Sequence, residues 1–303
     1  IGLDLTPWLR GGYGWRWNYD PAALGRTVLL VAITLIYVVG GWALIHRKSA
    51  AFTLIWALIG TVALSLGTTY AHYGNPLPVL FARTLDVTTT GQHDSALQLD
   101  WENEQWRDWS DFMRQLDGHI ALSPPGGTFV YGTLNATLEN TPTLAEALRE
   151  PLFGYQCHNY AFINMTPAQQ ATTWFGILLP LWSALTVLPL YAAAKRLIDG
   201  QGARWAVLWW ALVPGLAGFS ASWNTLYPLL AITALWCLQR GFSGKPPWFI
   251  AAGLITGLAL FTNFAFVPLP AVFGFYTLGY YWFHERENQP IYRPVIVGLW
   301  FGL

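Results

Sequence analysis

Residues 27–45 read TVLLVAITLIYVVGGWALI, nineteen consecutive residues without a charged side chain. A helix rises about 1.5 Å per residue, so a stretch of this length can cross the roughly 30 Å hydrocarbon core of a bilayer. The rest of the chain is similar, because 54% of its 303 residues are hydrophobic and only 11% are charged, against about 25% in an average soluble domain. The composition therefore predicts an all-α polytopic membrane protein.

Further apolar stretches predict about seven or eight transmembrane helices in all. After residues 27–45, the predicted spans are Ala51–Thr69, Thr173–Ala194, Trp205–Ser220, Trp223–Leu238, Trp248–Thr262, Phe264–Phe283 and an eighth that starts near Val295 and stops at Leu303. Because the eighth stops in mid-span and residue 1 is Ile, we expect the chain to be a fragment of a longer protein. The predicted organisation is an exterior N-terminal segment (1–26), two transmembrane helices (27–69), an exterior loop domain (70–172) and a truncated transmembrane bundle (173–303).

Basic residues predict which way the chain crosses the membrane. They lie in every second short connection, at residues 46–48, 195–204, 240–245 and 286–293, and short basic connections favour the cytoplasmic side. The loop 70–172 then lies outside, and its four arginines and eleven acidic residues give it a formal charge of −7. Such a charge argues against nucleic-acid partners. It suits a divalent metal as a possible cofactor, a cationic partner or carboxylate chemistry.

Two amphipathic helices are expected inside this loop. In the first, residues 100–116 read DWENEQWRDWSDFMRQL, and one helical face carries Trp101, Trp106, Trp109, Phe112, Met113 and Leu116. This face could lie in the membrane plane at the headgroup level or pack on a small core of the loop itself. The second helix is expected at residues 141–149, TPTLAEALR, where Thr143 and Glu146 have the spacing of a capping box.

Between these two helices, residues 118–131 read GHIALSPPGGTFVY. A helix that ends in a short polar stretch, followed by Pro-Pro-Gly and an aromatic-rich return toward the membrane, resembles the His-Pro-Pro element of GT-C membrane glycosyltransferases. These are the protein O-mannosyltransferase and aminoarabinose transferase type, grouped as glycosyltransferase family 39. Residues 185–200 and 205–224 are similar to the bacterial branch of that family. The resemblance covers residues 83 to 262.

The resemblance implies a transferase that takes a sugar from a polyprenyl-phosphate carrier at the outer face of a bacterial inner membrane, with the large loop in the periplasm. Its expected partners are the lipid-linked sugar donor, membrane lipid and other membrane subunits, without nucleic acid. In the family, a carboxylate near the start of the loop acts as general base or metal ligand. The matching catalytic candidates are Asp100, Glu102 and Asp111, while Glu104, Asp108 and the more distant Asp94 are further possibilities. The candidate substrate-binding residues are His119, Ser123, Pro124, Pro125 and Gly126.

The sequence differs from the family at one residue of the Pro-Pro element, and this difference leaves two other classes of protein as alternatives. Ser123 stands where the family has histidine before Pro-Pro, and serine cannot replace imidazole in proton transfer. The alternative is a catalytically inert, transferase-like structural subunit of a larger respiratory or photosynthetic complex, whose aromatic spans pack against pigment, quinone or another subunit. A transporter is the third hypothesis, and it would require broken helices with charged residues near the midplane.

Overall fold

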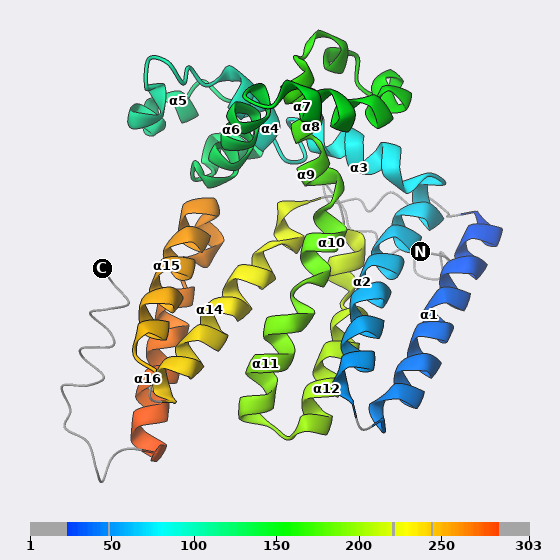
Figure 1. Cartoon of the computed structure of the whole chain (residues 1–303), viewed down its shortest axis with the longest axis vertical. Helices are drawn as coiled ribbons and strands as arrows, with labels where there is room; N and C mark the ends of the chain where they lie inside the picture. The colour runs from blue at the N-terminus through cyan, green and yellow to red at the C-terminus, as the bar shows by residue number, and fades with distance from the viewer. Residues whose placement is uncertain (1–22, 48, 220–221, 244, 285–303) are drawn as a thin grey trace, which may run out of the picture.

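The computed structural model describes residues 23–47, 49–219, 222–243 and 245–284. Throughout these ranges the chain forms helices and no strands, which confirms the predicted all-α class. The helices form two layers, a membrane bundle and a cap that lies across one end of it (Figure 1). Most of the predicted N-terminal segment, residues 1–22, and the predicted eighth span near Val295 lie outside the described residues.

The bundle starts with an antiparallel hairpin of two long helices, α1 (Leu24–Ile45) and α2 (Ala50–Tyr73). Ser49 caps α2 by accepting a hydrogen bond from the backbone N–H of Ala51. The ring of Tyr37 packs over Gly60, where any Cβ would lie 2.0 Å from the ring. The Tyr37 hydroxyl then donates to the carbonyl oxygen of Leu208 at 2.8 Å. Because Gly60 has no side chain, the Tyr37 ring can pack between α1 and α2 and its hydroxyl can reach the helix that carries Leu208.

The third crossing, Pro167–Leu197, is long and apolar enough to span a membrane, but it consists of several short helices. They are α8 (Pro167–Thr172), α9 (Trp174–Ile177), α10 (Leu179–Ala184) and α11 (Val187–Leu197). Pro180 and Pro189 have no backbone N–H to donate, so the helical hydrogen-bond pattern is interrupted along this stretch. Figure 1 shows the pieces following one another down the bundle.

The remaining bundle elements are α12 (Gly200–Trp210), α13 (Pro214–Gly218), the 3-10 turn η6 (Trp223–Thr225), α14 (Tyr227–Phe242), α15 (Pro247–Thr262), the 3-10 turn η7 (Phe264–Phe266) and α16 (Leu269–His284). Besides the third crossing, the stretches long and apolar enough to span are Leu24–Ile45, Ala50–Tyr73 and Phe264–Phe283, and Pro247–Thr262 is a shorter apolar helix. The predicted span at residues 205–220 is not one helix, because α12 ends at Trp210 and a new helix starts at Pro214. The protein is a polytopic membrane protein.

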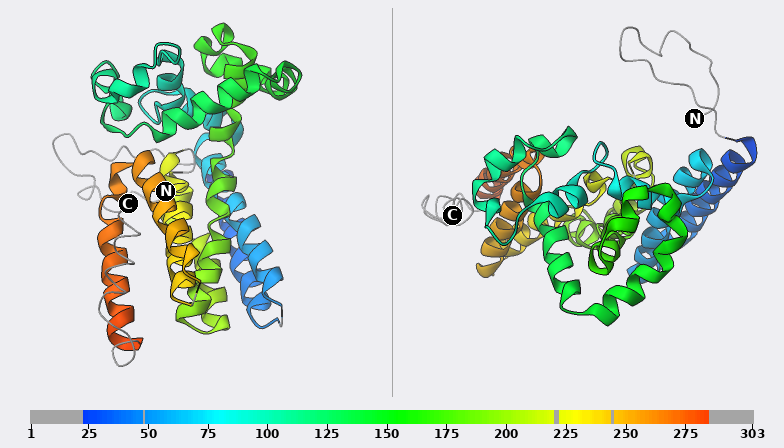
Figure 2. Two further views of the ribbon diagram at one scale, coloured as in Figure 1. Left: turned by 60° about the vertical axis from the view of Figure 1, so that its left-hand side comes forward. Right: turned by 90° about the horizontal axis from the view of Figure 1, so that it is seen from above.

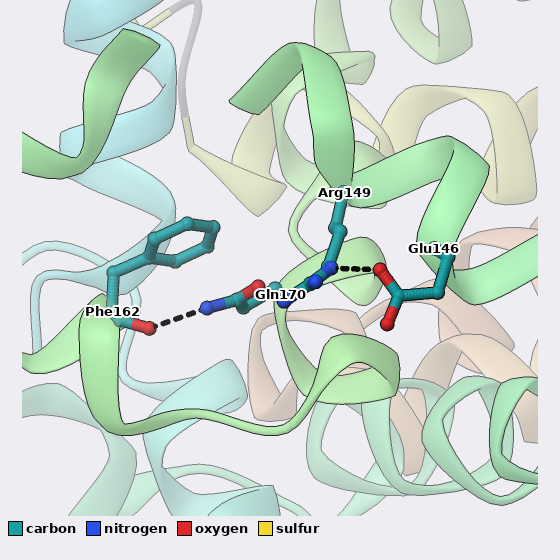
Figure 3. Close-up of polar contacts among 4 residues, drawn as sticks. All are labelled: Glu146, Arg149, Phe162 and Gln170. Carbon is teal, nitrogen blue, oxygen red and sulfur yellow. Dashed lines mark hydrogen bonds and ion pairs between the residues drawn. The ribbon is translucent and has the colours of Figure 1, made fainter. Parts of the chain in front are cut away.

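The cap is built from short helices and 3-10 turns. They are α3 (Pro76–Leu85), α4 (Gln92–Gln98), η2 (Gln105–Asp108), α5 (Trp109–Met113), η3 (Gly118–Leu122), α6 (Gly126–Glu139), α7 (Pro142–Arg149), η4 (Glu150–His158) and η5 (Tyr160–Asn164), followed by α8. One of its cores is formed by the fully buried side chains of Leu80, Phe81, Leu152 and Phe162. Beside this core, the Gln170 side-chain amide donates to the carbonyl oxygen of Phe162 at 2.8 Å, and Arg149 pairs with Glu146 (Figure 3).

The predicted continuous helix over residues 100–116 is wrong. Residues 101–104 form a turn in which Glu104 has a positive φ of 55°, so helical structure begins only at Gln105. The side chains of Phe112 and Leu116 are buried with Leu99 and Ile120. The C-terminal part of the apolar stripe therefore packs on a small core within the cap, as one of the two interpretations expected, whereas Trp101 and Trp106 stay exposed.

Two other local predictions for the loop need correction. The helix expected at 141–149 is present as α7, but it starts at Pro142, its N-cap Thr141 makes no side-chain cap, and Glu146 pairs with Arg149. The capping box lies instead at α8, between Thr166 and Gln169. The segment after Pro-Pro-Gly does not return to the membrane, because it forms α6, which stays in the cap (Figure 1).

Candidate functional site

An acidic turn precedes η2 and holds two of the three predicted catalytic carboxylates, Asp100 and Glu102. Both are exposed. The carboxylate of Asp100 accepts hydrogen bonds from the backbone N–H of Asn103 at 3.0 Å and from its side-chain amide at 2.7 Å. These hydrogen bonds lower the pKa of Asp100. Asp100 therefore holds the turn in place with the same oxygens that a substrate would need.

Asp111 and Glu102, the other two predicted catalytic residues, differ in whether their carboxylates have a partner. Asp111, on α5, is exposed and forms an ion pair with Arg114 at 3.2 Å. Glu102 is exposed at the turn, and no hydrogen-bond or ion-pair partner of its side chain is found in the described ranges. Of the three predicted catalytic residues, Glu102 has the carboxylate that is most available to a ligand.

The predicted substrate-binding residues come together in one tight turn. The Ser123 hydroxyl donates to the carbonyl oxygen of His119 at 2.9 Å, and the Ser123 carbonyl accepts from the Trp109 indole N–H at 3.2 Å. Pro124 is buried, Pro125 precedes the first turn of α6, and the His119 side chain is exposed. The Ser123 side chain is thus engaged in the turn, and the role of these residues in binding substrate stays a prediction.

Gly126 and Gly127 seat α6 directly on its neighbours. A Cβ on Gly126 would lie 2.5 Å from the carbonyl oxygen of Phe261 at the end of α15, and one on Gly127 would lie 2.4 Å from the Gln92 side chain on α4. Such distances are shorter than any van der Waals contact. Backbone blocks a side chain at Gly126, and at Gly127 the Gln92 side chain would have to move. Gly126 is therefore one point at which the cap docks on the membrane bundle, and Figure 1 shows α6 above the upper end of α15.

A buried histidine forms a second link between the cap and the third crossing. The Nε2 atom of His93, on α4, lies 3.0 Å from the carbonyl oxygen of Gln169 and 3.1 Å from the Thr172 hydroxyl, both on α8. Its ring packs edge-on against Tyr131 of α6, with centroids 5.2 Å apart. Burial lowers the pKa of His93 to about 4, so the imidazole is neutral at pH 7.

Within the described residues, several buried side-chain polar atoms have no hydrogen-bond partner. They include Gln92 Oε1, His93 Nδ1, Gln170 Oε1 and Trp223 Nε1, contributed by α4, α8 and η6. Unpaired buried polar groups are costly, and a native structure usually pairs them with water or a ligand. Sequence reasoning missed this group, because Gln92 and Gln170 are far apart in the chain and neither belongs to a motif.

Asp94 lies next to His93 on α4. Among the candidate carboxylates from the sequence, it is the one that precedes the group at residues 100–111. Burial raises its pKa, and a hydrogen bond from the Gln98 side chain opposes part of that effect. A carboxyl with a raised pKa is better suited to take up a proton near neutral pH than a fully solvated one. The structure therefore gives a physical reason to test Asp94, which the sequence had offered as the more distant candidate.

The fold and these contacts define a class of protein, a multi-pass membrane protein whose helical cap, rich in carboxylates, docks on one end of the bundle. Comparison with known families gives a match to part of the chain. The model of the dolichyl-phosphate-mannose-protein mannosyltransferase family matches residues 169–300, from α8 through the membrane helices that follow. This match supports a membrane glycosyltransferase of the GT-C type. No curated protein and no solved structure matches the chain.

Proposed function

We propose that the protein is a glycosyltransferase that takes a sugar from a polyprenyl-phosphate carrier and transfers it to an acceptor at the outer face of the membrane. The family match at residues 169–300 carries this proposal, because dolichyl phosphate is itself a polyprenyl phosphate. A lipid-linked donor also suits a cap that docks at the end of a membrane bundle. The same match gives no support to the structural-subunit alternative.

The distribution of basic residues supports an outward-facing cap. Arg47 follows α1, Arg196 lies in the last turn of α11 and Arg240 lies in the last turn of α14. These helix ends lie at the end of the bundle opposite the cap (Figures 1 and 2). Because basic connections favour the cytoplasmic side, the cap would lie outside, and in a bacterial inner membrane that side is the periplasm.

We assign the role of general base to Glu102. In the proposed step, an acceptor hydroxyl oxygen bonds to the anomeric carbon of the donor sugar while the bond from that carbon to the phosphate oxygen breaks. The carrier leaves as polyprenyl phosphate, and the hydroxyl proton passes to the Glu102 carboxylate. General-base catalysis of this kind contributes typically about 10²–10⁴-fold to a rate. In the described part of the chain, no group of three or more His, Cys, Asp or Glu side chains is arranged to hold a metal ion.

Transfer is tested with the purified protein in proteoliposomes that contain a radiolabelled mannosyl-phosphoryl-polyprenol and a membrane extract as the source of acceptor. The expected result is radioactivity that moves from the donor to an acceptor fraction with the wild-type protein and is strongly reduced with Glu102→Gln. Unchanged donor after prolonged incubation, with glucosyl and aminoarabinosyl donors tried in parallel, would overturn the proposal.

The orientation of the protein in the membrane can be tested separately, because one of its two cysteines is exposed in the cap and the other is buried in the bundle. Cys157 is exposed in η4 of the cap, and Cys237 is buried in α14. A membrane-impermeant maleimide added to intact cells should label Cys157, and a Cys157→Ser variant should remain unlabelled. Labelling of Cys157 only after the cells are broken would place the cap inside.

A further inference from the structure

An exposed apolar stripe runs along one side of α15. It consists of Ile250, Leu254, Leu258 and Phe261, spaced as one helical face. In a membrane bundle such a face is covered by lipid chains. Its upper residue, Phe261, lies at the end of the helix on which the cap docks.

Aromatic rings continue this stripe into the cap. The ring of Phe129, on α6, lies 5.6 Å from that of Phe261, and the rings of Trp101 and Trp106 lie 5.3 Å and 6.1 Å from Phe129. These are normal centroid distances for edge-to-face pairs. We use the name aromatic track for the stripe on α15 together with the rings of Phe129, Trp101 and Trp106.

The cap end of the aromatic track is held rigidly. The Trp101 indole N–H donates to the carbonyl oxygen of Ala96 at 3.0 Å. The ring lies against Gly132, where a Cβ would be 2.0 Å from it. Even so, Trp101 and Trp106 each remain more than a third exposed. Two neighbouring indoles that are open to solvent, one of them fixed by a hydrogen bond, are suited to bind an apolar ligand rather than to complete a core.

The charge at this end of the aromatic track is negative. Residues 100–108 contain four carboxylates and one arginine, which gives a formal charge of −3. Arg107 lies over the Trp106 ring at 5.3 Å and pairs with Glu104, so its charge is already matched. Asp100, Glu102 and Asp108 are left as net negative charge, which disfavours an anionic headgroup and favours an uncharged or cationic one.

We propose that the aromatic track binds a long-chain membrane amphiphile with an uncharged or cationic headgroup, and that this amphiphile is the acceptor of the transfer. The lower half of the aromatic track faces the bilayer and the upper half reaches the acidic turn, and a lipid chain can lie along both. An acceptor hydroxyl on the bound headgroup would lie next to Glu102. The inference about the acceptor rests on the proposed function, whereas binding of the amphiphile does not.

Binding is tested by photo-cross-linking in phosphatidylcholine nanodiscs. Three probes share a hexadecyl chain with a diazirine near the headgroup and differ only in that headgroup: glucoside, trimethylammonium or phosphate. Peptide mapping after irradiation should place the glucoside and trimethylammonium adducts on the peptides that contain Trp101, Phe129 or Phe261, several-fold above the phosphate probe. Phe129→Ala and Gly132→Ala, which remove or displace a ring of the aromatic track, should abolish the preference. Phe275→Ala, at an exposed phenylalanine of α16, should leave it unchanged.

The headgroup preference and the role of the amphiphile as acceptor are tested by two further measurements. In the double variant Glu102→Gln, Asp108→Asn, the phosphate probe should gain labelling relative to the glucoside probe. Equal labelling by all three probes in the wild-type protein, or labelling that survives Phe129→Ala, would overturn the binding proposal. If the glucoside probe labels the aromatic track but never receives sugar while another acceptor does, the acceptor assignment is overturned and the glycosyltransferase proposal stands.

Discussion

Gly126, the first residue of α6, packs so closely on Phe261, the residue before the last of α15, that a Cβ on the glycine would lie 2.5 Å from the phenylalanine carbonyl oxygen. This contact joins the cap to the membrane bundle through backbone rather than through flexible side chains. A methyl group at residue 126 cannot be accommodated by a rotamer change alone.

We therefore expect Gly126→Ala to destabilise the protein by about 1–3 kcal/mol, the usual cost of overpacking a tight site. The measurement is the thermal unfolding midpoint in detergent. Gly257→Ala is the matched control, because Gly257 lies within α15 and a Cβ there would meet nothing within 4 Å. Alanine favours a helix over glycine by about 1 kcal/mol, so the control should be neutral or stabilising. Equal losses in both variants would contradict the packing explanation.

The buried His93 should make stability depend on pH. Its pKa is about 4 in the folded protein and about 6.5 in the unfolded chain, so the unfolded chain binds the proton more tightly. The stability that neutral His93 contributes is fully present above pH 6.5 and is lost as the pH falls toward 4, by up to about 3 kcal/mol.

The measurement is the unfolding midpoint at pH 7, 6, 5 and 4 for three proteins. His93→Gln should have a shallower decline below pH 6.5 than the wild type, because its side chain does not titrate. His119→Gln, which replaces an exposed histidine of the cap, should follow the wild-type curve. A decline in His93→Gln as steep as in the wild type would show that other groups cause it.

Glu102 and Asp111 should differ in their effect on transfer. In the proposed mechanism Glu102→Gln removes the general base, whose carboxylate has no partner among the described residues. The rate constant for transfer should then fall by about 10²-fold or more with little change in donor binding. Asp111→Asn removes a carboxylate already paired with Arg114, and the rate should change by less than about threefold, because exposed ion pairs contribute little. Asp94→Asn belongs in the same series. A larger loss in Asp94→Asn than in Glu102→Gln would move the base to α4.

Arg204 should be a structural residue at the end of the bundle opposite the cap. Its guanidinium donates to the carbonyl oxygen of Ile45 at 3.0 Å and also bonds the carbonyl of Arg47. The Ile45 carbonyl is one of the unpaired groups at the end of α1, and Arg47 follows that helix. Arg204→Ala should therefore lower stability by about 1–3 kcal/mol, measured as the unfolding midpoint. Lys195→Ala, at an exposed lysine of α11, should stay within about 0.5 kcal/mol of the wild type.

Local sequence predicted some parts of the site correctly and others wrongly. The helix at α7 follows from its composition, but the expected helix over residues 100–116 does not form, because Glu104 turns the chain and Asp100 is hydrogen-bonded to Asn103. Periodicity could not reveal this, since a turn held by side chains can carry the same apolar spacing as a helix. Likewise, Pro180 and Pro214 were visible in the sequence, but only the structure shows that the chain divides into short helices there.

The sequence alone determined that the chain is a helical membrane protein with one long acidic loop, because bilayer crossing and charge depend on composition and on local spacing. Only the tertiary structure decided that this loop is a cap seated on α15 and that a phenylalanine of the cap continues the apolar side of a membrane helix. It also decided that, among the described residues, the carboxylates of Asp100 and Asp111 have partners and that of Glu102 has none. Those features depend on pairs such as Gly126 with Phe261 and His93 with Thr172. Residues so far apart in the chain are brought together by packing, which no local pattern encodes.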